Sequence, residues 1–258
     1  QGRPGDDMRT AFLQSGPQMI AELDAHTDVK FVAATAHPDY IGNLPGEAFG
    51  GRALAPLPFE GSVLGADFDR VRPPRREFMG LGGMMVNRNE LDALLNPLRS
   101  TANLKTTLKV VLPYFKSRLR FKRGTRLVMG NALVARLFHS LRQAGVDIRF
   151  GWRLTSLAHE QGRVVGARFS AHGTEHILRA RVGVVLATGG VGHHAALRRE
   201  LDPTGTEVHP LAPPSVRGDG VSSARELGAA IEQHPGNFFW QPVSRVPRSD
   251  GSTGLFPH

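Results

Sequence analysis

The chain has 258 residues, 40% of them hydrophobic and 21% charged, an ordinary balance for a globular protein. It has no cysteine, which excludes disulfides, iron–sulfur clusters, thiolate zinc sites and cysteine nucleophiles within these residues. The net charge of +9 invites a nucleic-acid interpretation, but 27 of the 32 basic residues are arginines spread through every segment, which is more typical of a compositional bias than of a binding surface.

The first half of the chain is expected to combine helices with a long irregular segment. Residues 6–26 carry apolar side chains at helical spacing, although Gly16-Pro17 should kink or divide that helix. A short strand is expected over 30–34. The Gly- and Pro-rich stretch 37–85 is too long for a simple connection and is therefore functional or poorly ordered. Two helices follow, over 89–97 and 101–118.

The elements between residues 130 and 190 are the best defined by the sequence. Asn131 can cap a helix that stops at Ala144-Gly145. Strand alternation follows from Val146 to Phe150. A small antiparallel unit with a turn at Gln161-Gly162 is then expected, over 153–158, 163–170 and 174–179. A further helix is expected from about Gly220 to Gly228.

The most informative stretch is the apolar run of residues 182–187 and the Thr188, Gly189 and Gly190 that end it. A continuous Val/Leu run is typical of a strand buried on both faces of a parallel sheet. The glycines let backbone pass close to a ligand at the carboxyl end of that strand, where open α/β sheets bind nucleotides. These features predict an α/β fold.

The order of these pieces resembles the flavoprotein family that includes fumarate reductases and 3-ketosteroid dehydrogenases. The resemblance spans nearly the whole chain and is carried by Pro38-Asp-Tyr40, Gly51-Arg52, Leu64-Gly65, Gly82-Gly-Met-Met85, Gly130-Asn-Ala-Leu-Val134, Gly162-Arg-Val-Val-Gly166, Leu186-Ala-Thr-Gly-Gly190, Gly218-Asp-Gly220 and Gly228-Ala229. It implies FAD as the cofactor, bound by an incomplete Rossmann domain of the glutathione-reductase type that is followed by the start of a cap domain.

The resemblance also implies a division of the chain. Residues 1–128 would line the substrate side, 129–231 would form the core FAD-binding segment, and 232–258 would begin a truncated catalytic cap. The family begins with a Gly-x-Gly-x-x-Gly turn, which we do not find in this sequence. The nearest candidate, Gly80-Leu-Gly-Gly83, does not match, because Met85 occupies the position of the third glycine. We therefore expect an internal fragment of a protein roughly twice as long, inactive in isolation.

Cofactor contacts are implied at three places. The Thr188–Gly190 turn would approach the adenosine and pyrophosphate half of FAD, the alternative being a tight turn with no ligand. Asp219 and Gly220 resemble the family position whose carboxylate hydrogen-bonds the flavin side, and Asp219 can also cap a helix. Arg153 lies where the family uses backbone groups to contact the adenine edge.

Substrate contacts are implied in the first half of the chain and near its end. Tyr40 is the candidate catalytic residue, with simple packing as the alternative, because ketosteroid dehydrogenases usually read Pro-Asp-Tyr-Tyr here; Ile41, in the second position, cannot transfer a proton. Arg52 can bind a phosphate or a substrate oxygen, or form a surface salt bridge. Met84 and Trp240 are expected to line the substrate site, although Met84 can equally fill the core.

The predicted function is dehydrogenation, or the reverse reduction, of a carbon–carbon bond next to a carbonyl on a hydrophobic 3-ketosteroid-like substrate. One alternative is a flavin reductase of small unsaturated acids such as fumarate or urocanate. Such a reductase needs a histidine or arginine cluster for the carboxylate, and the segment Trp240-Gln-Pro242 has no histidine. A remote alternative is a basic nucleic-acid-binding protein that uses residues 116–126. We expect no nucleic-acid partner, no metal site, no membrane span and a cytoplasmic location.

Overall fold

The structure is a computed structural model that describes residues 5–40, 42–202, 208–231 and 242–257. The chain divides into two compact units, Gln1–Val146 and Asp147–His258, and each is considered by itself. The expected boundaries after residues 128 and 231 concern the domains of a longer protein and stay predictions. Among the described residues, no helix is long and apolar enough to cross a membrane.

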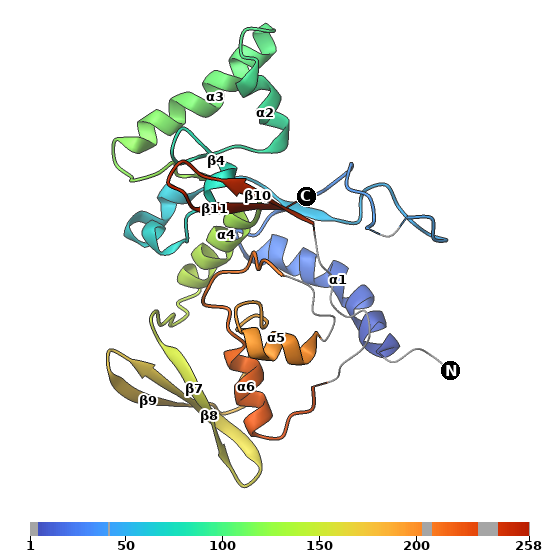
Figure 1. Ribbon diagram of the computed structural model, residues 1–258, viewed down its shortest axis with the longest axis vertical. Coiled ribbons are helices and arrows are strands. Elements are labelled where there is room, and N and C mark those ends of the chain that lie inside the picture. Colours follow the sequence, from blue (N-terminus) through green and yellow to red (C-terminus); the bar gives the residue numbers. More distant parts are fainter. Residues whose placement is uncertain (1–4, 41, 203–207, 232–241, 258) are drawn as a thin grey trace. The chain divides into compact units, whose positions relative to one another are not determined.

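The first unit joins helices through short antiparallel strand pairs (Figure 1). Its α-helices are α1 (Asp6–His26), α2 (Arg88–Leu95), α3 (Thr101–Arg118) and α4 (Met129–Gln143). Its strand pairs are β1 (Phe31–Ala33) with β2 (Leu54–Pro56), β3 (Phe59–Glu60) with β6 (Arg126–Leu127), and β4 (Met79–Gly80) with β5 (Met84–Met85). Two 3₁₀ segments complete it, η1 (Gly61–Arg70) and η2 (Arg76–Phe78).

The helices of this unit lie where the sequence predicts them, with two corrections. Helix α1 runs through Pro17 without a break. Proline deprives only the carbonyl of Leu13 of its intrahelical donor, and Leu13 is 72% exposed, so water can satisfy that carbonyl. Asn131 is not the cap of α4, because Val128 occupies that position and the Asn131 amide donates instead to the carbonyl of Arg72 at 2.9 Å.

Two glycines close the irregular segment that follows β1. The Gly51 amide donates to the carbonyl of Ala34 at 2.8 Å, and a Cβ added to Gly50 would lie 2.0 Å from the carbonyl oxygen of Thr35. A side chain at residue 50 therefore cannot be accommodated without moving backbone. The backbone at Gly50 and Gly51 therefore lies directly against the backbone at Ala34 and Thr35 and closes the loop between them.

Arg123 is buried in the first unit rather than exposed in a basic patch. Its side chain donates to the carbonyls of Phe68 and Val71, at 3.2 and 2.6 Å, and its guanidinium lies 4.0 Å from the centre of the Phe68 ring. Burial lowers the pKa of Arg123, an effect that the charge of Asp69 partly offsets. A nucleic-acid surface that includes Arg123 is therefore wrong.

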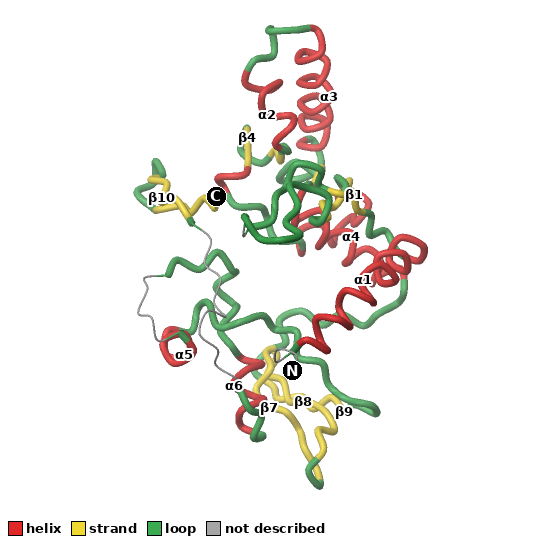
Figure 2. Tube along the Cα trace, turned by 90° about the vertical axis from the view of Figure 1, so that its right-hand side faces the viewer, coloured by secondary structure: helices red, strands yellow, loops and turns green. Residues whose placement is uncertain are grey.

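The second unit contains a three-stranded antiparallel sheet, whose strands lie next to one another in Figure 2. The order is β7 (Arg153–Glu160), β8 (Arg163–Ala171) and β9 (Thr174–Arg179), which confirms the predicted unit. Positive φ at Gln161-Gly162 and again at His172-Gly173 gives both hairpins the turn that matches strand twist. The unit also contains α5 (Ala195–Leu201), α6 (Asp219–Glu226) and the hairpin β10 (Val243–Pro247) with β11 (Thr253–Pro257).

Two predicted strands are wrong. Residues 146–150 and 182–187 lie outside any strand, and Val182 and Val185 are 94% and 91% exposed. A strand needs a neighbouring backbone to pair with, and every strand pair among the described residues is antiparallel and formed elsewhere. An apolar run alone therefore does not make a buried parallel strand.

Candidate functional site

An open groove of about 630 Å³ lies entirely within the second unit. It is formed by the start of β7, the middle of β8, the extended segment 184–188 and the residues that enter α6. Its lining residues are Gly151, Trp152, Arg153, Leu154, Ala167, Phe169, Val184, Val185, Leu186, Thr188, Ser215, Arg217 and Asp219. We call it the Thr188 groove. It brings together Arg153, Thr188 and Asp219, which the sequence predicts as cofactor contacts.

One wall of the Thr188 groove is aromatic and held rigidly. The Trp152 ring stacks on His176 with centroids 4.4 Å apart, and its centroid lies 5.9 Å from that of Phe169. Phe169 and His176 are partners across β8 and β9, so the sheet register fixes both rings. The guanidinium of Arg149 lies 4.6 Å from the Trp152 centroid. His176 and Arg149 therefore cover the faces of the Trp152 ring and hold it in place at the wall of the groove.

The opposite side is a glycine-mediated contact between the Thr188 turn and α6. The Gly220 amide donates to Thr188 Oγ1 at 3.1 Å. A Cβ on Gly220 would lie only 2.4 Å from that oxygen, so a side chain at residue 220 is incompatible with the contact. Asp219 is not the cap of α6, because Gly218 occupies that position and no side chain caps the helix; it is the first helical residue, where the helix dipole favours its carboxylate.

The two glycines after Thr188 differ in what surrounds them. Gly189 has φ of 78°, and a Cβ there would meet Val216 at 3.0 Å. A Cβ at Gly190 would meet no atom within 4 Å. Residues 183–190 lie outside any strand, so their amides and carbonyls face no ladder partner. The turn therefore combines amides that have no strand partner with open space beside Gly190.

Sequence reasoning missed several lining residues of the Thr188 groove. Arg217 is exposed and lines the groove two residues before Asp219, and Ser215 lies close by. Trp152 lies next to the predicted Arg153 and forms the aromatic wall. The only sequence signal for Arg217 is its position directly before Gly218-Asp219, since an isolated arginine is common throughout this chain.

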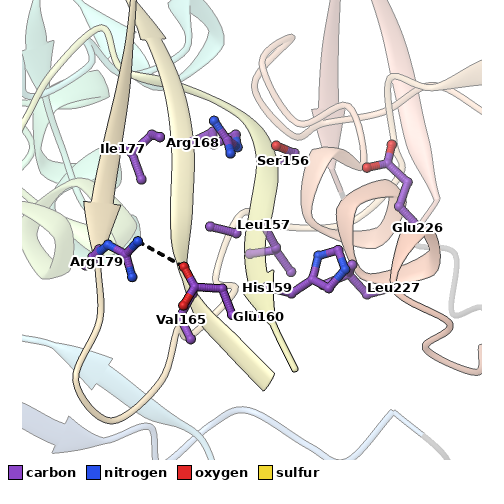
Figure 3. A pocket seen from close by; sticks show the side chains of 11 residues that line it. Ser156, Leu157, His159, Glu160, Val165, Arg168, Ile177, Arg179, Glu226 and Leu227 are labelled. Carbon is purple, nitrogen blue, oxygen red and sulfur yellow. Dashed lines mark hydrogen bonds and ion pairs between the residues drawn. The ribbon is translucent and has the colours of Figure 1, made fainter. Parts of the chain in front are cut away.

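A second groove, of about 420 Å³, lies between the sheet and the carboxyl end of α6 (Figure 3). Its arginines are already paired. Arg179 donates to Glu160 at 2.9 Å, as the dashed line in Figure 3 shows, and Arg168 lies 4.0 Å from Glu175. The carboxylate of Glu226 adds further negative charge to the lining. Paired charges leave little attraction for an anionic ligand, so we place the candidate site in the Thr188 groove.

The predicted substrate residues of the first unit have different surroundings. Tyr40 is 66% exposed, and its ring meets His37 edge-on at 5.7 Å. Met84 is buried against Val110 and Tyr114. Arg52 bonds to Asp39 at 2.9 Å and to the carbonyl of Gly46. Trp240 lies outside the described residues. Their roles toward a substrate stay predictions.

Because the ion pair of Arg52 and Asp39 is partly exposed, we expect Arg52→Met and Asp39→Asn each to lower the free energy of unfolding by no more than about 1 kcal/mol. The double variant should lose no more than Arg52→Met alone, since both changes break the same ion pair and only Arg52→Met also removes the bond to the Gly46 carbonyl. Urea unfolding of the three proteins measures this. Additive losses would mean that the two side chains act separately.

Comparison with known proteins identifies clear relatives. A family described as FAD binding domain matches residues 2–258. A 3-oxosteroid 1-dehydrogenase of Mycolicibacterium smegmatis is 32% identical over 229 residues, covering 86% of this chain and 39% of that protein. A 4-oxocyclohex-2-ene-1-carboxylate 5-dehydrogenase of Sinomonas cyclohexanicum is 28% identical over 256 residues, covering 96% and 42%.

Among solved structures, the chain resembles 3-ketosteroid delta1-dehydrogenase from Sterolibacterium denitrificans, in complex with 1,4-androstadiene-3,17-dione. The TM-score is 0.80 and the identity 26%, over 96% of this chain and 44% of the other. The chain therefore spans about two fifths of the length of the relatives that it matches.

Proposed function

Because the chain belongs to the family of FAD-binding domains, we propose that it is part of an FAD-dependent dehydrogenase acting on a carbon–carbon bond next to a carbonyl. The proposed substrate is a hydrophobic cyclic ketone of the 3-ketosteroid type, and the reverse reduction is the same chemistry run backwards. The observation that carries the cofactor assignment is the Thr188 groove, where an aromatic wall, bare backbone and a carboxylate at a helix start meet.

The residues of this groove fit a dinucleotide. Backbone amides of the Thr188–Gly190 turn are free of strand partners, and the open space at Gly190 admits a ligand close to the main chain. Trp152 and Leu154 supply apolar surface, and Arg217 supplies a cation for phosphate oxygens. Asp219 would accept a hydrogen bond from the cofactor. The Rossmann topology and the start of a cap domain belong to the same proposal.

When bound, FAD supplies the acceptor for the hydride that leaves the substrate. The chain's own residues position the cofactor through the Thr188 groove. Tyr40 Oη, once deprotonated, is the proposed acceptor of the proton that leaves the substrate carbon next to the carbonyl, and Ile41 has no group that could assist it. Tyr40 follows Asp39, whose carboxylate is fixed by Arg52 at 2.9 Å and by the Ala48 amide, which donates to it at 3.0 Å.

Flavin absorbance tests the cofactor proposal. We expect the purified 258 residues to retain much less than one FAD per chain, because they span only about two fifths of the length of the relatives that they match. A longer protein that includes the flanking sequence should retain one. Stoichiometric, tightly bound FAD in the 258 residues would contradict the fragment interpretation. Absence of flavin from the longer protein would contradict the function itself.

The substrate is tested separately in that longer protein. We expect turnover of 3-ketosteroids, measured by reduction of an artificial electron acceptor. A monocyclic oxo acid and fumarate serve as the competing substrates. Turnover of fumarate alone would replace the proposal by a reductase of small unsaturated acids.

Gly190→Leu is expected to lower the FAD affinity of the longer protein at least about tenfold, because the added side chain occupies the space proposed for the cofactor. In the 258 residues the same change should alter the free energy of unfolding by no more than about 0.5 kcal/mol, since it meets no neighbouring atom. Gly183→Leu is the matched control, because a Cβ at Gly183 also meets no atom within 4 Å but Gly183 lies outside the Thr188–Gly190 turn at which the cofactor is proposed to bind. Equal flavin affinity in both variants would move the cofactor elsewhere.

A further inference from the structure

Helix α3 carries a stripe of exposed apolar side chains. Leu104, Leu108, Leu112, Phe115 and Leu119 follow one another at intervals of three or four residues, so they lie along one face of the helix. Their exposed fractions are 40%, 46%, 61%, 57% and 89%. We call this face the leucine stripe. Apolar surface of this kind, concentrated on one helix face, calls for a partner.

The rotation of α3 about its axis is fixed by the opposite face. Val110 and Tyr114 are buried against Met84, and the Tyr114 hydroxyl donates to the carbonyl of Leu81 at 2.5 Å. Thr107 donates to the carbonyl of Ala93 at 2.9 Å and so joins α3 to α2, which lies beside it in Figures 1 and 2. With these anchors in place, the leucine stripe cannot turn inward.

Lysines border the leucine stripe along one side. Lys105, Lys109 and Lys116 are exposed, and within the described part of the chain none of them is paired with a carboxylate. Four of the five lysines of the protein lie between residues 105 and 122. No aspartate or glutamate occurs between Asp92 and Asp147. Helix α3 itself therefore carries only cationic charge, and the two carboxylates of the neighbouring α2 are already bonded, Glu90 to Arg126 and Asp92 to Asn96.

We propose that the leucine stripe docks α3 onto the surface of a membrane that contains anionic lipids, with the helix lying in the plane of the interface. An apolar face bordered by lysines buries its side chains at the edge of the acyl chains while the ammonium groups reach the headgroup phosphates. This proposal does not rest on the flavin chemistry of the second unit.

The charge pattern favours a lipid surface over other occupants. A second copy paired through the same stripe would bring two rows of unpaired lysines close together, which is repulsive. A nucleic acid offers phosphates and bases that stack on aromatic rings, but the stripe has one aromatic residue, Phe115, and four leucines. Anionic lipid supplies both the apolar layer and the negative charge.

Vesicle flotation tests the proposal. We expect the 258-residue chain to float with phosphatidylcholine vesicles that contain phosphatidylglycerol and to bind them at least about tenfold more weakly when Leu108, Leu112 and Phe115 are all replaced by serine. The matched control replaces Met8, Phe12 and Leu13 by serine on α1, where three comparably exposed apolar side chains lack a lysine border. That variant should float like the unmodified chain. Circular dichroism confirms that both variants are folded.

The lysines have their own variant. Replacing Lys105, Lys109 and Lys116 by glutamine should reduce binding to anionic vesicles to the level seen with pure phosphatidylcholine. Flotation that is absent, or lost equally in the α1 variant, would overturn the proposal. A dimer of the unmodified chain that dissociates when Leu108, Leu112 and Phe115 are replaced by serine would also overturn it. So would salt-sensitive binding to heparin by a chain that does not bind lipid.

Fluorescence quenching provides a second measurement that does not depend on a destabilising change. Phe115→Trp should be quenched by brominated lipids, and Phe12→Trp should not. The same pair of variants in the longer protein shows whether another part of the polypeptide covers α3. If brominated lipids do not quench the Phe115→Trp variant of the longer protein, the proposal is overturned.

Discussion

Replacing Gly220 by alanine is expected to separate the Thr188 turn from helix α6 and to remove bound flavin from the longer protein. The new Cβ would lie 2.4 Å from Thr188 Oγ1 and 3.6 Å from the Leu186 Cβ. The clash and the weakened bond from the Gly220 amide should cost about 2 kcal/mol of unfolding free energy. Because displacement of the turn changes the shape of the Thr188 groove, the FAD affinity of the longer protein should fall at least about tenfold.

The partner of the clash provides the control for this result. Thr188→Ala removes the oxygen that the new Cβ would meet, so Thr188→Ala with Gly220→Ala should be more stable than Gly220→Ala alone. Gly130→Ala is the control for glycine replacement in a helix, because its Cβ meets nothing within 4 Å and helix propensity favours alanine by up to about 1 kcal/mol. Thermal unfolding of the chain and flavin content of the longer protein measure both effects. If Gly220→Ala is equally destabilising in the Thr188→Ala background, the proposed contact is not the cause.

The parts of the fold that sequence could predict are those with local causes. The sheet of β7, β8 and β9 follows from alternation within each strand and from turns that need positive φ at Gln161-Gly162 and His172-Gly173. Helix α3 follows from its periodicity and from the Ser100 side chain, which caps it. In each case the information lies within a few residues of the element.

What sequence could not predict depends on distant partners. Residues 182–187 have the composition of a buried strand, but a parallel strand exists only where another backbone lies beside it. The apolar residues of α1 show the same dependence, since helical spacing predicts a buried face and Met8 and Phe12 are both 75% exposed. Periodicity identifies the face of an element and leaves open what covers it.

The candidate site shows this contrast as well. Asp219 and Gly220 were predicted from the resemblance of Gly218-Asp-Gly220 to the flavoprotein family, and the structure adds a reason for the glycine, since a Cβ at Gly220 would lie 2.4 Å from Thr188 Oγ1. Arg217 and Trp152 were missed because nothing local distinguishes them, and Trp152 reaches the groove directly before β7, with its ring beside that of Phe169 on β8. Arg123 was misplaced for the opposite reason, since its neighbours in sequence are exposed and basic while its own side chain is buried.

Arg123→Met is therefore expected to destabilise the first unit by about 3 kcal/mol. The carbonyls of Phe68 and Val71, which end the η1 segment, would lose their donor, and the Phe68 ring would lose the guanidinium that lies 4.0 Å away. Arg123→Lys should be intermediate, because an ammonium keeps the charge but cannot reach both carbonyls and stack at the same time. Urea unfolding followed by circular dichroism measures the three stabilities.

Arg120 is the matched control for this series, because it lies three residues away, is exposed, and approaches the ring of Phe121 only to 5.9 Å. Arg120→Met should change the free energy of unfolding by no more than about 0.5 kcal/mol, as exposed substitutions generally do. A pair of arginines with opposite outcomes would show that burial, and not the basic character of residues 116–126, makes Arg123 important. Equal and small losses in both variants would mean that the Arg123 guanidinium reaches solvent and that the contacts to Phe68 and Val71 contribute little.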